Sequence, residues 1–184
     1  MKVKTRIRHS RIVATMTKRR LAVLLVAAAT VSTATALARA ALMTPNSGVL
    51  TNNVVARAGF ADATDLKFKV QGQSEQVTLV SNAQDTVMQQ VVIAPGGYTG
   101  WHTHPGPVLV LVKAGALTLY SGEDPTCTGR TYTAGQAFVD RGQGHVHIGR
   151  NEGSENLEIW SAYFDVPPGQ PFRIDAPSPG NCSF

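Results

Sequence analysis

Residues 96–115 read GGYTGWHTHPGPVLVLVKAG, and this stretch carries the strongest structural signal in the chain. It places two histidines, His102 and His104, one residue apart and just before an apolar run. A second His-x-His pair, His145 and His147, follows later in the sequence. Residues i and i+2 of a strand point to the same face, so both imidazoles of a pair can enter one cavity. Two such pairs predict a metal site whose ligands come from at least two strands.

The paired histidines also have a simpler explanation, in which they are half-buried strand residues that form hydrogen bonds without a metal. The sequence contains five histidines. His9 belongs to the N-terminal segment described below, and the other four make up the two pairs. This concentration, beside glycine-rich turns, favours a metal site over hydrogen bonding alone.

From Leu66 onward, short runs of β-branched, aromatic and aliphatic residues alternate with clusters of Gly, Pro, Asn or Asp. This rhythm is typical of all-β domains. Helical periodicity is absent from this part of the sequence, which favours a sandwich or jelly roll over a parallel α/β sheet. A turn is expected at residues 94–97. The predicted strands are Leu66–Val70, Gln76–Val80, Thr86–Ile93, Val108–Lys113, Ala116–Tyr120, Arg130–Thr133, Gln136–Asp140, His145–Arg150 and Leu157–Phe164.

The first histidine pair lies in a pattern that resembles the first motif of the cupin superfamily. That motif is Gly, five residues, His-x-His, three or four residues, Glu, six residues and Gly. The chain has Gly96, His102, His104, Val108 and Gly115 at this spacing, so only the glutamate is missing.

The second cupin motif ends in Gly, two residues, His, three residues and Asn, which matches Gly144, His147 and Asn151. The resemblance covers about residues 66–165, and it is to secreted, single-domain, quercetin dioxygenase-like cupins. It implies an all-β, single-domain double-stranded β-helix, which is a small jelly-roll barrel. The metal ligands that it implies are His102, His104 and His147.

Departures from the family pattern change the expected metal chemistry. Val108 stands where the family commonly has a glutamate ligand. Gly142 replaces the proline of the second motif, whose leading glycine is displaced by one position, to Gly135. Three imidazoles and water would then hold the ion. Such ligands favour Fe, Cu, Ni, Co or Zn over Mn or Mg, so the expected cofactor is one divalent transition metal ion.

Several other side chains are candidates for the same site. His145 shares the parity of His147 on the predicted strand, so it is expected as a fourth metal ligand or as a partner of the ligands. Glu158 is the best candidate to supply the missing carboxylate from another strand. Either Gln89 or Gln90 must face the interior, where its amide can bind substrate or satisfy a buried backbone group.

Residues 1–40 have the features of a signal peptide. Residues 1–20 contain eight Lys or Arg and no acid, residues 21–31 are almost wholly apolar, and Ala38-Arg39-Ala40 offers a small-x-small cleavage site. A retained membrane anchor is the alternative, because residues 21–40 are about long enough to span a bilayer. The basic pair within Lys18–Leu21 leaves twin-arginine export open. The expected location is secreted or extracytoplasmic.

The mature chain is expected to be one domain. Residues 41–65 are polar and aperiodic, which predicts an irregular lead-in, and the cupin-like barrel follows at 66–165. Residues 166–184 are rich in Pro and Gly and predict an irregular tail. An oxidising destination favours a disulfide between Cys127 and Cys182, with two independent thiols as the alternative.

The charge balance limits the partners of the mature chain. Residues 1–40 hold nine of the seventeen Lys and Arg and none of the twelve acids, so eight basic residues remain beyond them. Eight basic residues against twelve acids give the mature chain a net negative charge, which excludes a nucleic-acid role. The expected partner is a small-molecule ligand or substrate, with membrane contact only through an uncleaved signal. Exposed sheet edges leave a homodimer open.

Two functions remain open from the residues. A three-histidine site with free coordination positions can bind substrate and oxygen together, which suits an oxygenase or another metal-assisted enzyme acting on a small organic molecule. The resemblance to cupin dioxygenases implies the same class. The alternative is a non-catalytic protein that binds a small molecule or a metal chelate in the barrel. No nucleophile motif such as Gly-x-Ser-x-Gly occurs in the sequence, and catalytic residues beyond the metal ligands are not identified.

Overall fold

The structure is a computed structural model, and it describes residues 43–71 and 76–184. The predicted signal peptide, residues 1–40, lies outside these ranges. The regular elements of the described chain are twelve strands. No helix within the described ranges is long and apolar enough to cross a bilayer. The predicted all-β class is therefore confirmed.

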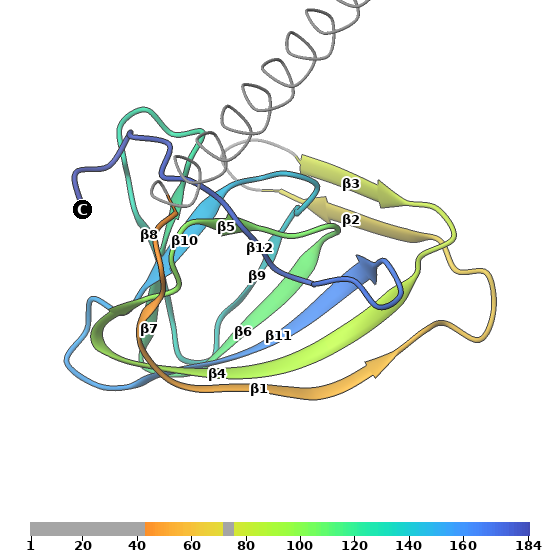
Figure 1. Cartoon of the computed structure of the whole chain (residues 1–184), viewed down its shortest axis with the longest axis horizontal. Helices are drawn as coiled ribbons and strands as arrows, with labels where there is room; N and C mark the ends of the chain where they lie inside the picture. The colour runs from red at the N-terminus through yellow and green to blue at the C-terminus, as the bar shows by residue number, and fades with distance from the viewer. Residues whose placement is uncertain (1–42, 72–75) are drawn as a thin grey trace, which may run out of the picture. The chain divides into compact units, whose positions relative to one another are not determined.

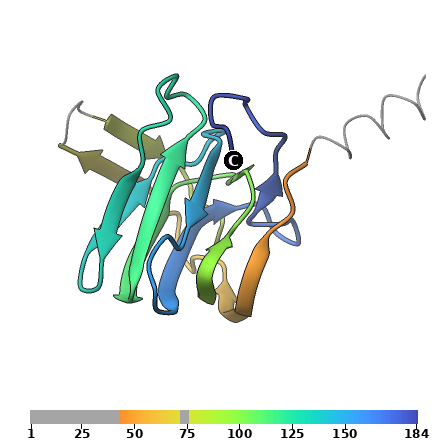
Figure 2. The same ribbon diagram turned by 90° about the vertical axis from the view of Figure 1, so that its left-hand side faces the viewer.

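Ten of the described strands form one sheet that curls into a barrel with two halves (Figures 1 and 2). The halves join where Arg150 pairs with Tyr98. This arrangement is the predicted double-stranded β-helix. One half contains, in spatial order, β1 (Ser47–Ala58), β4 (Asp85–Tyr98), β11 (Leu157–Val166), β6 (Val108–Ala114) and β9 (Ala137–Asp140). The other contains β8 (Arg130–Thr133), β7 (Ala116–Ser121), β10 (His147–Arg150), β5 (His102–Thr103) and β12 (Ile174–Asp175).

Alternating apolar residues fill the barrel interior. In β6, Val108, Val110 and Val112 are buried, whereas Leu111 between them is exposed. The three valines join Leu117 of β7 in one apolar cluster, so both halves of the barrel contribute to the core. The two-residue period of a strand explains this division into an inner and an outer face.

The remaining two strands, β2 (Leu66–Val70) and β3 (Gln76–Val80), pair with each other outside the main sheet. The ring of Phe68 in β2 lies 5.3 Å from the ring of Phe164 in β11, measured between centroids. This contact packs the β2–β3 pair against the barrel.

The predicted irregular lead-in at residues 41–65 is wrong for twelve of its twenty-five residues. Ser47–Ala58 forms β1, which pairs antiparallel with β4. Most of its side chains are exposed, so the strand shows no apolar alternation in the sequence and is held by backbone pairing instead. The predicted turn at 94–97 is also wrong, because β4 continues through these residues to Tyr98.

Two other differences from the predicted strands affect the site. The strand expected to start at His145 starts at His147, because His145 closes a turn by donating its backbone N–H to the carbonyl oxygen of Gly142. The tail is largely irregular, but it contains the short strand β12, which pairs with β5.

The tail is fastened to the barrel by a disulfide and by hydrogen bonds. Cys127 and Cys182 form the predicted disulfide, with their Cα atoms 5.3 Å apart. Next to it, the Asn181 side-chain amide donates to the backbone carbonyl oxygens of Ser121 and Asp124. The tail therefore has a fixed path across the end of the barrel that carries β5 and β10.

Gly142 occupies the position at which the family motif has proline. Its φ of 60° is in the left-handed region, which proline cannot adopt. A Cβ at this position would also overlap the carbonyl oxygen of Gly106. The departure from the motif therefore follows from the backbone conformation of this turn.

Removal of the disulfide is expected to lower the free energy of unfolding by about 2–4 kcal/mol, because the bridge restricts the unfolded chain over a separation of 55 residues. Urea unfolding of a Cys127→Ser, Cys182→Ser variant beside the wild type measures this difference. Identical unfolding curves for the two proteins would contradict the stabilising role of the bridge.

Gly142→Ala is expected to destabilise the protein more than Gly135→Ala, by at least about 2 kcal/mol. Both glycines have positive φ, which costs a residue with a Cβ about 1–2 kcal/mol. Only Gly142 adds a steric overlap, since a Cβ at Gly135 meets no atom within 4 Å. Equal losses in urea unfolding would show that the Gly106 backbone moves aside at little cost.

Candidate metal centre

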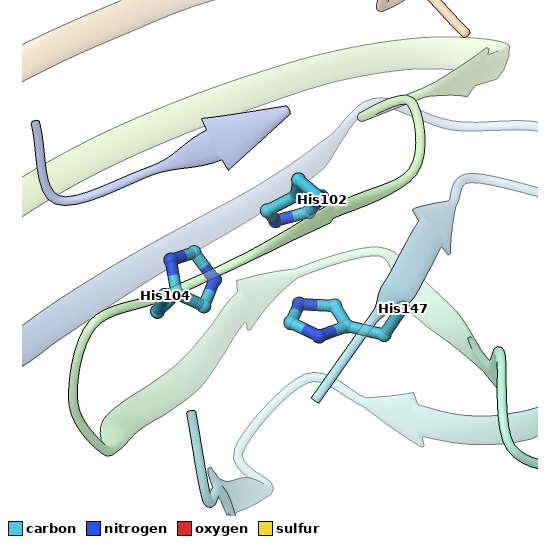
Figure 3. Close-up of side chains that lie close together, drawn as sticks. All are labelled: His102, His104 and His147. Atoms are coloured by element: carbon cyan, nitrogen blue, oxygen red, sulfur yellow. The ribbon is translucent and has the colours of Figure 1, made fainter. Parts of the chain in front are cut away.

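His102, His104 and His147 point toward one another inside the barrel (Figure 3). His102 lies on β5, His104 follows that strand directly, and His147 opens β10 opposite His102 in the antiparallel register. The ring centroids are 4.4 to 5.2 Å apart. All three side chains are buried. The structure thus brings together the three histidines that the motif resemblance implies.

The Nδ1 atom of each imidazole is engaged by a backbone carbonyl oxygen. His102 Nδ1 donates to Gly100 at 2.8 Å, and His104 Nδ1 donates to Phe172 at 2.8 Å. His147 Nδ1 donates to the carbonyl oxygen of His145 at 3.3 Å. A carbonyl oxygen can only accept, so each Nδ1 carries the proton. In the neutral ring, Nε2 then keeps a lone pair that can bind a metal.

Burial keeps these imidazoles neutral. Desolvation is the main cause that lowers the pKa of His102 and His147, and it lowers the pKa of His104 to about 3. Positive charge on neighbouring histidines and on Arg173 acts in the same direction. Neutral imidazole is the form that coordinates metal. The three candidate ligand atoms lie within 4.8 Å of one another, so small ring rotations bring them to about 2.1 Å from one ion.

Asp140, at the end of β9, supports His147 from the side opposite its Nε2. Its Oδ2 lies 3.4 Å from His147 Nδ1 and 2.6 Å from His145 Nδ1. Burial acts to raise the pKa of Asp140, but the hydrogen bonds from His145 and from the Gly142 backbone N–H, together with the nearby His147 ring, outweigh it and lower the pKa to about 2. A carboxylate at this position fixes the orientation of the imidazole that it contacts.

The structure does not place His145 with the other three histidines. Its Nδ1 donates to Asp140, and its Nε2 lies 2.9 Å from the hydroxyl oxygen of Ser121. Asp140, His145 and His147 are themselves close enough to form a second potential metal group. The 2.6 Å contact to Asp140, however, is typical of a charge-assisted hydrogen bond. His145 is thus a neighbour of the predicted ligands through Asp140.

Glu158, the best candidate from the sequence for the missing carboxylate, does not supply it. Its Oε1 accepts hydrogen bonds from Gln90, Lys113 and Trp160, which face away from the cavity. These bonds lower its pKa to about 2. Side chains of β11 alternate between its two faces, and Glu158 lies on the outer face of the barrel. Val108, at the glutamate position of the motif, is buried among the apolar side chains of the core.

A cavity of about 80 Å³ adjoins the three histidines. Its walls are mostly apolar, with the side chains of Gln89, Tyr163 and Arg173 among the polar groups. The Tyr163 hydroxyl donates to Gln89 Oε1 at 2.5 Å, and Gln89 Nε2 in turn donates to Asn52 of β1. Burial raises the pKa of Tyr163 to about 12, so its hydroxyl stays protonated. Gln89 is therefore the inward-facing glutamine of the predicted pair.

Sequence reasoning missed Asp140, Tyr163 and Arg173 as residues of the site. Asp140 ends a predicted strand and precedes the second histidine pair by five positions, which is a usable signal. Tyr163 has inward parity on a predicted strand, but it could not be distinguished from a core aromatic residue. Arg173 stands in the tail, where the sequence shows no periodicity.

No protein-family model matches the sequence, and no curated protein is similar to it.

Solved structures are similar to this chain in three dimensions. A conserved protein with a double-stranded β-helix domain from Klebsiella pneumoniae is 19% identical, with a TM-score of 0.47, and the alignment covers 73% of this chain and 90% of that chain. An oxalate oxidase bound to the substrate analogue glycolate is 28% identical, with a TM-score of 0.39 and coverage of 47% of this chain and 45% of that chain. A cupin-2 domain protein from Shewanella frigidimarina is 19% identical, with a TM-score of 0.34 and coverage of 42% and 68%. This chain thus spans less than half of the oxalate oxidase chain.

The free energy of unfolding of the metal-free protein is expected to fall as the pH drops below about 6.5. The pKa of His104 is 6.5 in an ordinary environment and about 3 in the folded protein, so between these values the unfolded chain binds a proton that the folded chain does not. Each such histidine contributes a slope of about 1.4 kcal/mol per pH unit.

Urea unfolding between about pH 7.5 and about pH 5 measures that slope. His104→Gln is the matched variant, and its slope should be smaller by about 1.4 kcal/mol per pH unit. A wild-type protein equally stable across this range would contradict the buried, neutral state of the imidazoles.

Proposed function

We propose that this chain is an exported, cupin-type protein that binds one divalent transition metal ion and acts as a metal-dependent enzyme on a small organic molecule. The observation that supports it best is the arrangement of His102, His104 and His147. Each imidazole commits Nδ1 to a backbone carbonyl oxygen and keeps Nε2 for the centre of the group. Three neutral nitrogen ligands favour Fe, Cu, Ni, Co or Zn.

The metal, when bound, supplies a Lewis acid with coordination positions left free for water, substrate or oxygen. The chain's own residues have separate roles in this proposal. The three histidines hold the ion, and Asp140 keeps the ring of His147 in position. Apolar side chains such as Val108 and Leu117 line the cavity and exclude bulk water.

A non-catalytic binding protein is the second candidate, and the state of the polar groups near the cavity favours it. Both ring nitrogens of His145 already have partners. Tyr163 stays protonated because burial raises its pKa to about 12. Asp140 is held by His145 and by the backbone N–H of Gly142. These groups offer no free general base, so an enzyme at this site would depend on a reaction driven by the metal.

Export is supported by the chemistry of the two cysteines. The disulfide between Cys127 and Cys182 is stable in an oxidising compartment and uncommon in a reducing one. It agrees with the signal peptide that residues 1–40 predict, and it suits a secreted or extracytoplasmic protein.

Purified protein is expected to carry close to one equivalent of a transition metal. His102→Ala and His147→Ala should each reduce the metal content or affinity at least about tenfold, since each removes a proposed ligand. Elemental analysis of protein purified without added metal measures this. His145→Ala is the matched control and should retain the metal, because its ring nitrogens are engaged elsewhere.

Wild-type protein that takes up no metal even after supplementation would overturn the proposed function. Equal metal contents in the wild type and both ligand variants would show that the metal binds somewhere else.

A further inference from the structure

Arg173 lies beside the three histidines because of the register between the tail and β5. Asp175 pairs with His102 and Ile174 pairs with Thr103 in this antiparallel ladder. Arg173 directly precedes this short strand, and its side chain lines the cavity. An arginine that reaches the cavity therefore comes from a segment outside the two histidine motifs.

The guanidinium of Arg173 is fixed in place and still has donor capacity. Its Nη2 donates to the carbonyl oxygen of Thr99 at 2.7 Å, and its Nε donates to Asp175 Oδ1 at 2.9 Å. Its Nη1 makes no hydrogen bond within the described part of the chain. A guanidinium held in this way can offer N–H groups to a carboxylate with little loss of conformational entropy.

The charge of the cavity also favours an anionic ligand. Arg173 and Asp140 carry the only charges among the described side chains that line it. The Asp140 carboxylate is engaged by His145 and by the Gly142 backbone, while the Asp175 side chain that faces Arg173 is 63% exposed. A divalent ion on three neutral imidazoles would add positive charge beside Arg173, whose counter-ion Asp175 is mostly exposed, and positive charge away from water is costly without a nearby anion. An anionic ligand removes that cost.

The size and walls of the cavity limit the anion further. A volume of about 80 Å³ is several times the roughly 10–15 Å³ that a single water needs, so the cavity suits a ligand of a few non-hydrogen atoms. Val91, Leu117, Phe138 and Ile159 are among the wall residues and favour an apolar body over a polyhydroxylated one. A short organic acid satisfies both limits.

We propose that Arg173 anchors the carboxylate of a small organic acid in this cavity, with the apolar part of the acid against the barrel wall. The inference rests on the proposed function, because the charge argument includes the metal. It deepens that function by naming the ligand class and the residue that selects it.

Binding of propanoate to the zinc-loaded protein, measured by isothermal titration calorimetry, tests the proposal, with neutral propanamide as the matched ligand. Propanoate should bind about 10- to 100-fold more tightly than propanamide, which is the difference in affinity expected from one charged hydrogen bond. Arg173→Gln should weaken propanoate binding and reduce this preference, leaving only the part due to the metal. Arg130→Gln, which makes the same charge change at an exposed arginine on β8, should keep the preference.

Arg173 also contacts Thr99 and Asp175, so its replacement could weaken binding by displacing the tail. A second pair of variants distinguishes this effect from loss of a direct contact between Arg173 and the ligand. Asp175→Asn removes the competing carboxylate and leaves the arginine in place, so propanoate should bind as tightly as to the wild type or more tightly. Arg173→Lys keeps the charge and should bind propanoate more tightly than Arg173→Gln does. Weakened binding in Asp175→Asn to the level of Arg173→Gln would overturn the anchoring role.

The zinc content of each sample, measured in parallel, distinguishes the two proposals. Two outcomes with stoichiometric zinc would overturn the ligand inference and leave the metal site standing. In the first, wild type and Arg173→Gln bind propanoate with equal affinity. In the second, the wild type binds propanoate and propanamide equally. Absence of zinc from the wild type overturns the proposed function. Propanoate binding that depends on Arg173 in that metal-free protein would still support the anchor.

Discussion

Backbone carbonyl oxygens of Gly100, Phe172 and His145 accept hydrogen bonds from three buried imidazoles. A buried N–H must find an acceptor, and a carbonyl oxygen leaves only one ring tautomer compatible with the bond. The lone pairs of His102 and His104 are thereby directed to the same side of the strand. The chemistry of the site therefore depends on backbone positions that no side-chain motif specifies.

One of these acceptors links the site to the C-terminal tail. Phe172 lies in the tail, next to Arg173, and the tail is held by β12 and by the disulfide. A loose tail would remove the acceptor of His104 together with the arginine at the cavity. The disulfide, although remote from the histidines in the sequence, thus contributes to the geometry of the site as well as to stability.

Apolar alternation predicted the all-β class, the motif resemblance implied the barrel and the three clustered histidines, and the export signal favoured the disulfide. Alternation is imposed by burial of one face of a strand, so it is visible wherever a strand covers the core, as in β4, β6 and β11. It is absent from β1, whose side chains are mostly exposed and whose pairing uses backbone groups. The parity argument for His145 fails for a related reason, because parity applies only within a strand and β10 starts two residues later; of its two expected roles, the geometry fits that of a partner of the ligands. Arg173 was not predictable, since its position follows from the register of a two-residue strand in the tail.

The most direct measurement is the tautomeric state of the imidazoles, observed by long-range ¹H–¹⁵N NMR of the metal-free protein near neutral pH. We predict that His102, His104 and His147 are neutral with the proton on Nδ1, and that zinc shifts the Nε2 resonances of all three. A proton on Nε2, or a charged ring at any of the three positions, would contradict the central claim that the fold prepares these nitrogens for a metal.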